Sequence, residues 1–295
     1  MKHKNKTFLF KTLALLPNSI GDTLYHKMQR MSNANSVLSK IKSSEVTYDC
    51  LVKICEELKI SLENKSILEI GSGWFPIMPY FFKYKFKVKD IFTYDINKHY
   101  QKKAILEFNS LFSRQYNCTI DVESNNKYGL PSGIDYFPSK NVIEEKLPQV
   151  DLVFSRYVLS HATTEDVIGM HKKFIETYPK GTYLIHFISP SDLRQHGDAS
   201  ISLQDFLQYS KEEWDEIQTK YDSHNRLRLP QFVEIFKSLG LEIVYLTYES
   251  SKPDSLNIKL LRELKLHNDY QGYTEEELTA GNIVMALRIQ NNKSV

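Results

Sequence analysis

Short apolar runs and helically spaced apolar residues alternate along most of the chain. The apolar runs predict strands at 67–70, 91–94, 150–154, 182–188, 241–247 and 282–289. The helical spacing predicts amphipathic helices at 43–60, 97–114, 163–179 and 229–239. Because strands and helices alternate, the pattern predicts an α/β fold with a parallel sheet that helices cover on both faces.

The pattern also suggests where the chain divides. We expect an N-terminal helical segment over 1–62, a main domain over 63–290 and a short tail over 291–295. Residues 190–228 interrupt the alternation with an insertion rich in Asp, His, Arg and aromatic residues. In open α/β sheets ligands bind beyond the carboxyl ends of strands, so this insertion is well placed to cover a site.

The first residues allow two interpretations. Lys2, Lys4 and Lys6 precede an apolar stretch that Lys11 interrupts, and this stretch is too broken for a signal peptide. No apolar run approaches the roughly 18 residues that span a bilayer. The segment is either a first helix packed on the domain or a basic amphipathic segment on an anionic membrane surface.

Composition and charge narrow the function classes. The 295 residues carry a formal net charge of +2, which gives no whole-molecule field for nucleic acid. Alternating lysines over 83–89 are expected to be the wet face of an extended segment. The three cysteines are odd in number and form no C-x-x-C pair, which is typical of reduced thiols in a cytosolic protein.

The most informative motif is a glycine turn at the end of the strand over 67–70. It reads Glu69-Ile70-Gly71-Ser72-Gly73-Trp74-Phe75, and Asp95 closes the following strand. Two glycines permit a tight turn close to a ligand, and a carboxylate at the second strand tip can accept both hydroxyls of a ribose. The spacing therefore predicts an adenosine-containing ligand. Pro76 stands where a dinucleotide site needs a small residue, which disfavours NAD.

This motif resembles the E-x-G-x-G-x-G signature of class I S-adenosylmethionine-dependent methyltransferases, with Phe75 in place of the third glycine. Residues 147–161 resemble their fourth-strand segment, written LP…DLVxSxxVLEH. A narrower resemblance is to methyltransferases encoded with bacterial polysaccharide and glycolipid biosynthesis. It rests on Leu15-Leu16-Pro17 with Gln29-Arg30, on Gly133-Ile134-Asp135-Tyr136, and on Asp192-Leu193-Arg194-Gln195-His196 with Asn225-Arg226-Leu227-Arg228.

The resemblance implies a three-layer Rossmann-like fold with strand order 3-2-1-4-5-7-6 and strand 7 antiparallel. N-terminal helices and an insertion after strand 5 would be added to it. It also implies transfer of a methyl group from S-adenosylmethionine to an acceptor, first of all a sugar hydroxyl. The expected cofactor-binding residues are Glu69, Gly71, Ser72, Gly73, Trp74, Asp95, Ile96, Asn141, Ser155 and Arg156.

Among these residues, Glu69 suits the ammonium of the methionine moiety and Arg156 its carboxylate. Asn141, or Asp135, would meet the adenine amino group. Trp74 would either close over the cofactor or pack beneath the turn.

Histidines are the candidate bases, because a sugar hydroxyl is a poor nucleophile that benefits from losing its proton in the transition state. His196 is the first choice, since Asp192 or Asp198 would fix its tautomer. His161, directly after the fourth strand, is the second. His186 is interpreted either as an acceptor contact or as a core residue of its strand.

The insertion also supplies candidates for binding the acceptor. Asn225, Arg226 and Arg228 would clamp a phosphate or carboxylate of the acceptor, or would form a solvated helix start. The same Asp and His residues leave open a divalent cation, but no spacing is diagnostic and no metal is assigned.

The expected acceptor is a sugar, nucleotide sugar or lipid-linked glycan, and no nucleic acid partner is expected. The location would be cytoplasmic, with peripheral contact at the inner membrane face as a further option. The alternatives are methylation of another small oxygen or nitrogen acceptor, and a non-catalytic binding protein with a methyltransferase fold.

Overall fold

The computed structural model describes residues 3–17, 20–21, 23–25, 27–28, 37–123 and 125–290. Lys2, Gln29-Arg30 and the predicted tail 291–295 lie outside the described residues. In the part of the chain that is described, no helix is both long enough and apolar enough to cross a membrane.

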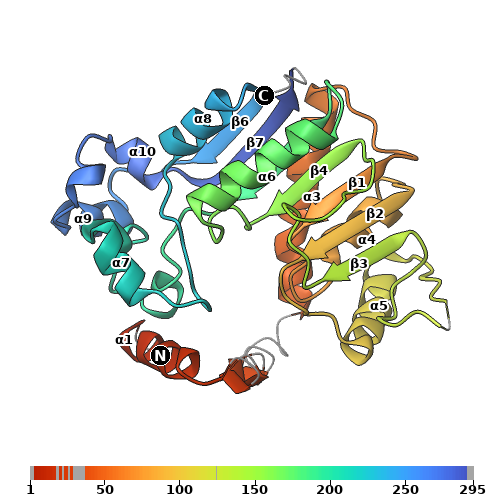
Figure 1. Cartoon of the computed structure of the whole chain (residues 1–295), viewed down its shortest axis with the longest axis horizontal. Coiled ribbons are helices and arrows are strands. Elements are labelled where there is room, and N and C mark those ends of the chain that lie inside the picture. Colours follow the sequence, from red (N-terminus) through yellow and green to blue (C-terminus); the bar gives the residue numbers. More distant parts are fainter. Residues whose placement is uncertain are drawn as a thin grey trace.

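Seven strands form one sheet in the order β3-β2-β1-β4-β5-β7-β6 (Figure 1). The strands are β1 (Ser66–Ile70), β2 (Asp90–Asp95), β3 (Ile134–Pro138), β4 (Leu152–Arg156), β5 (Tyr183–Ile188), β6 (Leu241–Glu249) and β7 (Gly281–Ile289). Strands β1 to β5 pair in parallel, whereas β7 pairs antiparallel with both β5 and β6. The predicted fold class, strand order and antiparallel seventh strand are confirmed.

Helices cover both faces of the sheet. One face carries α3 (Val37–Glu57), α4 (Ile77–Tyr84) and α5 (Lys102–Tyr116), and the other carries α6 (Thr164–Thr177) and α8 (Leu229–Ser238). Thr163 caps α6, because its side chain accepts a hydrogen bond from the backbone N–H of Asp166.

A separate lobe is built from two connections that are far apart in sequence. The insertion after β5 supplies η1 (Gln195–Gly197), η2 (Asp205–Gln208) and α7 (Lys211–Ile217). The connection between β6 and β7 supplies α9 (Leu256–Glu263), η3 (Asn268–Tyr270) and α10 (Glu275–Thr279). Their apolar side chains share one cluster, made of Phe206, Leu207, Trp214, Ile258, Leu261, Tyr270 and Leu278. No element was predicted over 248–281, where α9 and α10 lie.

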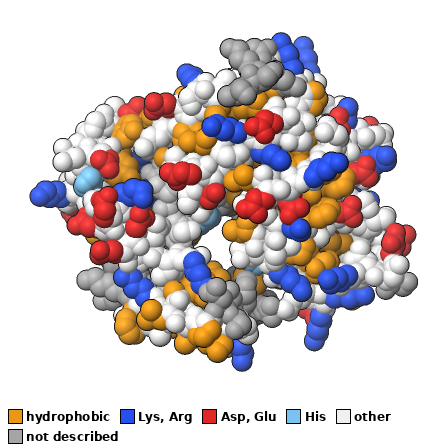
Figure 2. Space-filling model, in the orientation of Figure 1, with side chains coloured by type: hydrophobic (Ala, Val, Ile, Leu, Met, Phe, Trp, Pro, Cys, Tyr) orange, Lys and Arg blue, Asp and Glu red, His pale blue; other side chains and the backbone are white. Residues whose placement is uncertain are grey.

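The N-terminal segment lies beside this lobe. Helix α1 (His3–Ala14) buries Phe10 and Leu13, and the ring of Tyr25 stacks on Tyr221 of the insertion with centroids 4.5 Å apart. Figure 2 shows an opening between α1, the lobe and the sheet. The first segment therefore packs on the molecule through Phe10 and Leu13, while Phe8 and Leu15 stay exposed.

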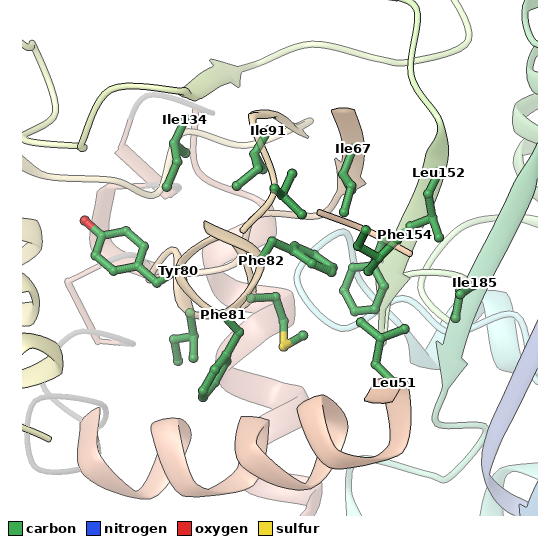
Figure 3. Close-up of a cluster of buried hydrophobic side chains, with 14 of the residues drawn as sticks. Leu51, Ile67, Tyr80, Phe81, Phe82, Ile91, Ile134, Leu152, Phe154 and Ile185 are labelled. Atoms are coloured by element: carbon green, nitrogen blue, oxygen red, sulfur yellow. The ribbon is translucent and has the colours of Figure 1, made fainter. Parts of the chain in front are cut away.

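The core on the α3 face is continuous across the sheet. Figure 3 shows Ile67, Ile91, Ile134, Leu152, Phe154 and Ile185 from five strands, and Leu51, Tyr80, Phe81 and Phe82 from α3 and α4. Each side chain in this set has an exposed fraction of at most 3%. This packing fixes the positions of the strand ends and of α3.

Helix α4 corrects one expectation about the lysine-rich run over 83–89. The run begins inside a helix that ends at Tyr84, and it is not an extended segment throughout. The reason is the apolar stretch immediately before it, because Tyr80, Phe81 and Phe82 bury the helix against the sheet.

Candidate functional site

The glycine turn after β1 has the backbone that its sequence predicts. Gly71 and Gly73 have φ of +79° and +59°, in the left-handed region that favours glycine. A Cβ on Gly71 would lie 2.2 Å from Cγ2 of Val158, whereas a Cβ on Gly73 would meet nothing within 4 Å. Gly71 is therefore packed against the loop after β4, and the backbone at Gly73 borders open space.

An open cleft of about 420 Å³ lies beside this turn, and we call it the glycine-turn cleft. The strand ends and the turn supply Glu69, Gly71, Ser72, Gly73, Trp74, Phe75 and Arg156, α3 supplies Ser39, Lys40, Ser43 and Ser44, and α4 supplies Ile77 and Met78. The volume is in the range of small-molecule sites.

Glu69 places a buried acid at this cleft. Its exposed fraction is 4%, and its Oε2 accepts a hydrogen bond of 2.5 Å from Oγ1 of Thr93 on β2. Burial raises the pKa of Glu69 to about 8, and the nearby Asp95 adds to this rise. A cation in the cleft would therefore favour the ionised form of this acid.

Arg156 places a positively charged guanidinium at the same cleft. Its Nε donates to Oγ1 of Thr47 at 2.9 Å, and its Nη2 donates to Oγ of Ser43 at 2.9 Å. The guanidinium also lies over the ring of Tyr157, 4.4 Å from the centroid. Burial lowers the pKa of Arg156 from its usual value, but a guanidinium in a protein keeps its charge. The cleft thus offers the carboxyl group of Glu69 and the guanidinium of Arg156 to a zwitterion.

Asp95 holds the glycine turn in place through hydrogen bonds. Its Oδ2 accepts from Oγ of Ser72 at 3.1 Å and from the backbone N–H of Gly73 at 3.3 Å, and its Oδ1 accepts from the N–H of Asn97 at 2.7 Å. The carboxylate is buried and is not among the residues that line the cleft. Its predicted part in binding a ribose would require some of these hydrogen bonds to be exchanged.

Three further predicted cofactor residues lie in different places. Trp74 lines the cleft, and its ring contacts that of His99 with centroids 4.6 Å apart. Ile96 follows β2 and is 73% exposed. Asn141 shapes the turn after β3, because its Oδ1 accepts from the N–H of Ile143 at 3.1 Å.

Ser155 and His186 do not reach the cleft, which corrects their predicted roles in binding cofactor and acceptor. Both are fully buried on the α6 face, with Oγ of Ser155 2.7 Å from Nδ1 of His186. Nε2 of His186 lies 3.1 Å from Nε2 of His171 on α6. Along a strand, side chains alternate between faces, so Ser155 points away from the face to which Arg156 points.

The arginines predicted to bind the acceptor are also buried. Arg226 donates from Nη1 to the carbonyl oxygens of Phe206 and Tyr209 at 3.0 and 2.7 Å. Arg228 donates from Nη2 to the carbonyl of Pro190 at 2.5 Å, and burial lowers its pKa to about 10. Exposed fractions of 4% and 1% contradict the solvated helix start, and they leave Arg228 no surface for an acceptor. Arg226 still lines an open cleft together with His161, so its predicted role in binding the acceptor stays a prediction.

Asn225 and Asp192 hold the lobe together. Nδ2 of Asn225 donates to the carbonyl oxygens of Leu159 and Ala162 at 2.6 and 2.9 Å, which ties the insertion to the loop after β4. Asp192 is 1% exposed and pairs with Nη2 of Arg194 at 2.6 Å. The contacts of Asp192 with Arg194 correct its predicted role in orienting His196. Asn225 lines an open cleft together with His161, so its predicted role in binding the acceptor stays a prediction.

His196 and His161 are both exposed at the surface. His196 lies in η1, and Nδ1 of His161 is 2.9 Å from the carbonyl oxygen of Ser223. Their predicted role as base stays a prediction. Within the described part of the chain, no group of three or more His, Cys, Asp or Glu side chains is placed to hold a metal ion.

The sequence interpretation missed the contribution of α3. Lys40, Ser43, Ser44 and Thr47 recur at three- and four-residue spacing, so they share one face of the helix that borders the cleft and Arg156. A polar stripe on the face that an amphipathic helix turns to the protein was the available signal.

Comparison with known proteins gives similarities of fold. No protein-family model matches the chain, and no curated protein matches it significantly. Magnesium protoporphyrin IX methyltransferase from Synechocystis PCC 6803, solved with bound S-adenosylhomocysteine, is 9% identical with a TM-score of 0.47, over 86% of this chain and 84% of that one.

A protein from Galdieria sulphuraria, provisionally described as a sarcosine dimethylglycine methyltransferase, is 16% identical with a TM-score of 0.47. The match covers 84% of this chain and 87% of that one. The O-methyltransferase region of StiE is 14% identical with a TM-score of 0.39, over 77% of this chain and 68% of that region.

Proposed function

We propose that the chain binds S-adenosylmethionine in the glycine-turn cleft and transfers its methyl group to an acceptor. The observation that carries this proposal is the placement of Glu69 and Arg156 in one cleft beside the turn of Gly71 and Gly73. The carboxyl group of Glu69 complements the ammonium of an amino acid, and the guanidinium of Arg156 complements its carboxylate. The open space beside Gly73 leaves room for a ligand. When bound, the cofactor supplies an electrophilic methyl group on its sulfonium.

The residues of the chain would position and activate the acceptor. Thr47 and Ser43 of α3 orient the guanidinium of Arg156, whose remaining N–H groups would hold a carboxylate, and Glu69 would hold an ammonium. Methyl transfer needs the acceptor in line with the methyl carbon, so this positioning contributes much of the rate. His196, or His161 in its place, would take the proton of the acceptor.

For the acceptor we propose a hydroxyl of a sugar, carried as a nucleotide sugar or a lipid-linked glycan. The support is the sequence resemblance to methyltransferases of polysaccharide and glycolipid biosynthesis, together with two exposed histidines that can serve as base. The alternatives are another small oxygen or nitrogen acceptor and a binding protein without catalytic activity.

We further propose that the chain works in the cytoplasm and contacts the inner membrane face through its N-terminal segment. The exposed fractions of Phe8 and Leu15 are 74% and 86%, and both residues share one face of the segment with Lys11. Residues 1–44 contain eight Lys and Arg against one Asp. Apolar side chains beside an excess of positive charge suit an anionic bilayer surface.

Two measurements test the activity. Calorimetry with S-adenosylhomocysteine should detect binding that Arg156→Met weakens at least about tenfold, because a charged hydrogen-bonding partner is lost. A tritiated-methyl transfer assay against pooled nucleotide sugars and lipid-linked glycans should detect product. His196→Ala should abolish transfer with cofactor affinity unchanged, and retained turnover would assign the base to His161.

The outcomes separate the alternatives. No binding of S-adenosylhomocysteine would overturn the proposed function. Binding without transfer to any acceptor class would indicate the non-catalytic binding protein.

A further inference from the structure

A second cleft, of about 300 Å³, adjoins the glycine-turn cleft on the same face of the sheet. We call it the β6–β7 cleft. Helix α3 lines it with Ser43, Val46, Thr47 and Cys50. Tyr157, directly after β4, and Phe187 of β5 also line it. The remaining lining residues come from β6 and β7 and are Thr247, Tyr248, Glu249, Asn282, Ile283 and Val284. Parallel strands end here and the antiparallel β7 begins here, so the cleft lies at the carboxyl edge of the sheet.

The two clefts share a wall. Ser43 lines both of them, and Arg156, which lines the first, is hydrogen-bonded to Ser43 and to Thr47 of the second. The same guanidinium lies over the ring of Tyr157, which lines the second cleft. The two clefts therefore meet at Ser43, with Arg156 and Thr47 beside it.

Two residues of the β6–β7 cleft have backbone conformations that residues other than glycine rarely adopt. Tyr157 has φ of +59° and Asn282 has φ of +43°. Such conformations cost about 1–3 kcal/mol each and cluster at functional sites. The backbone N–H of Tyr157 donates to the carbonyl of Phe187 at 2.7 Å, which holds the residue in this conformation.

The chemistry of the lining selects a ligand class. Among the described residues that line the cleft, Glu249 is the single acid and none is Lys or Arg, so this lining disfavours a phosphate or another anion. Nδ2 of Asn282 donates to Oε2 of Glu249 at 2.7 Å, which leaves further acceptor positions on the carboxylate for hydroxyl groups. Thr47 and Thr247 add hydroxyls, while Phe187 and Val284 give an apolar floor.

We propose that the β6–β7 cleft binds the acceptor as one uncharged, hydroxyl-bearing ring, with its charged or lipid carrier outside the cleft. Glu249 and Asn282 hold hydroxyls of the ring, and the ring of Tyr157 packs against its apolar face. This inference rests on the proposed function, because a methyl donor in the glycine-turn cleft is what makes the neighbouring cleft an acceptor site.

The test fills the cleft and leaves the cofactor residues unchanged. Thr247→Trp introduces a large side chain at an exposed strand position that faces α3. Leu246→Trp introduces the same side chain one residue earlier, where alternation points it to the other face of the sheet. Both proteins are assayed for tritiated-methyl transfer from S-adenosylmethionine to the pooled nucleotide sugars and lipid-linked glycans, and for S-adenosylhomocysteine binding by calorimetry.

We expect Thr247→Trp to lower transfer about 100-fold while binding S-adenosylhomocysteine as the wild type does, since a displaced acceptor loses in-line geometry. Leu246→Trp should leave both quantities unchanged. Transfer by Thr247→Trp at the wild-type rate would overturn the inference.

Alkylation of Cys50 provides a second test, which needs no substitution in the sheet. Cys50 lines the cleft and is half-buried, Cys55 is buried, and Cys118→Ser removes the other half-buried thiol. N-ethylmaleimide should abolish transfer by the Cys118→Ser protein and leave its S-adenosylhomocysteine affinity intact. The protein with both Cys118→Ser and Cys50→Ser should keep its own untreated rate after the same treatment.

The outcomes distinguish this inference from the proposed function. A wild-type protein that binds S-adenosylhomocysteine but methylates only acceptors without hydroxylated rings would overturn the inference alone. Unimpaired transfer by alkylated protein would also overturn it. A wild-type protein that binds no S-adenosylhomocysteine would overturn the proposed function itself.

Discussion

Gly71 and Gly73 have similar backbones but different surroundings. Both have positive φ, yet only Gly71 faces a neighbour, the Val158 side chain in the loop after β4. The sequence shows two equivalent glycines in one motif. The structure assigns the first to packing against the fourth strand's loop and the second to the ligand side of the turn.

We therefore expect Gly71→Ala to destabilise the protein more than Gly73→Ala. A non-glycine residue at positive φ costs about 1–2 kcal/mol in either variant, and the Val158 contact should add about 1–3 kcal/mol to Gly71→Ala. Urea unfolding measures both. The added replacement Val158→Ala should recover part of the loss in Gly71→Ala and none in Gly73→Ala. Equal losses in the two single variants would contradict this account.

Glu69 should couple ligand binding to proton release. Burial raises its pKa to about 8, so at pH 7 much of the carboxyl is protonated. A ligand ammonium favours the ionised form, so the affinity for S-adenosylhomocysteine should rise as the pH increases from 6 to 8. Calorimetry at pH 7 in two buffers of different ionisation enthalpy should detect the released proton. Glu69→Gln should release none, and release that persists in this variant would assign the proton to another group.

At the scale of elements, a directed hydrogen-bond chain joins β4, β5 and α6. The carbonyl oxygen of Val167 can only accept, so Nδ1 of His171, at 2.6 Å, must donate to it. Nε2 of neutral His171 then accepts from Nε2 of His186, and Nδ1 of His186 accepts from the hydroxyl of Ser155. The chain is fully satisfied only when both rings are neutral.

The protein should therefore lose stability in mild acid. Burial lowers the pKa of His171 to about 4 and that of His186 well below its usual value. An unfolded histidine titrates near 6.5, so between about pH 6.5 and 4 the unfolded chain binds protons that the folded chain does not. Stability should fall with falling pH by up to about 1.4 kcal/mol per pH unit and per group.

Melting temperatures across this pH range measure the effect. His171→Gln should flatten the dependence, whereas His196→Gln, at an exposed position, should leave it unchanged. An unchanged slope in His171→Gln would assign the acid sensitivity to other groups.

The sequence predicts elements better than it predicts the direction of side chains. The runs around Ile67, Ile91 and Val153 are apolar enough to identify central strands, and the glycine turn identifies the ligand edge. Ser155 and Arg156 are adjacent in the sequence, and only the position of the strand between two helical layers shows that one faces α6 and the other α3.

Buried charges set a further limit. Arg226 and Arg228 look like surface residues, because burying a guanidinium is costly without partners. Their partners are backbone carbonyls of η2, of the loop after β5 and of α10, which only the folded lobe brings together. Helices α9 and α10 were missed for the same reason, since each is short and buries few residues on its own.

At the scale of the whole molecule, the small net charge averages two unequal parts. Residues 1–44 carry eight Lys and Arg and one Asp, although the entire chain has a formal charge of +2. The exposed Phe8, Leu15, Ile20 and Leu24 belong to the same positive part. The N-terminal segment therefore combines an excess of positive charge with exposed apolar side chains.

We expect the protein to sediment with phosphatidylglycerol vesicles and not with phosphatidylcholine vesicles, and to be released by high salt. The double variant Phe8→Asp with Leu15→Asp should lower vesicle binding at least about tenfold, because two apolar anchors are lost. Leu256→Asp replaces an exposed apolar residue on α9, outside the N-terminal segment, and should leave vesicle binding unchanged. Equal loss in both proteins would show that the N-terminal segment is not the contact.

The position of β7 has a consequence for local unfolding. Strand β6 is at the edge of the sheet, next to β7, and the two strands together carry Thr247, Glu249, Asn282 and Val284 of the β6–β7 cleft. Strands at the edge of a sheet open more easily than central strands, and a ligand that binds only the closed form suppresses the opening by mass action. The amides of β6 and β7 would then exchange with deuterated solvent more slowly when the cleft is filled, whereas the amides between β1 and β2 would keep their rates. The edge of the sheet would thus record occupancy of the cleft as a change in exchange lifetime.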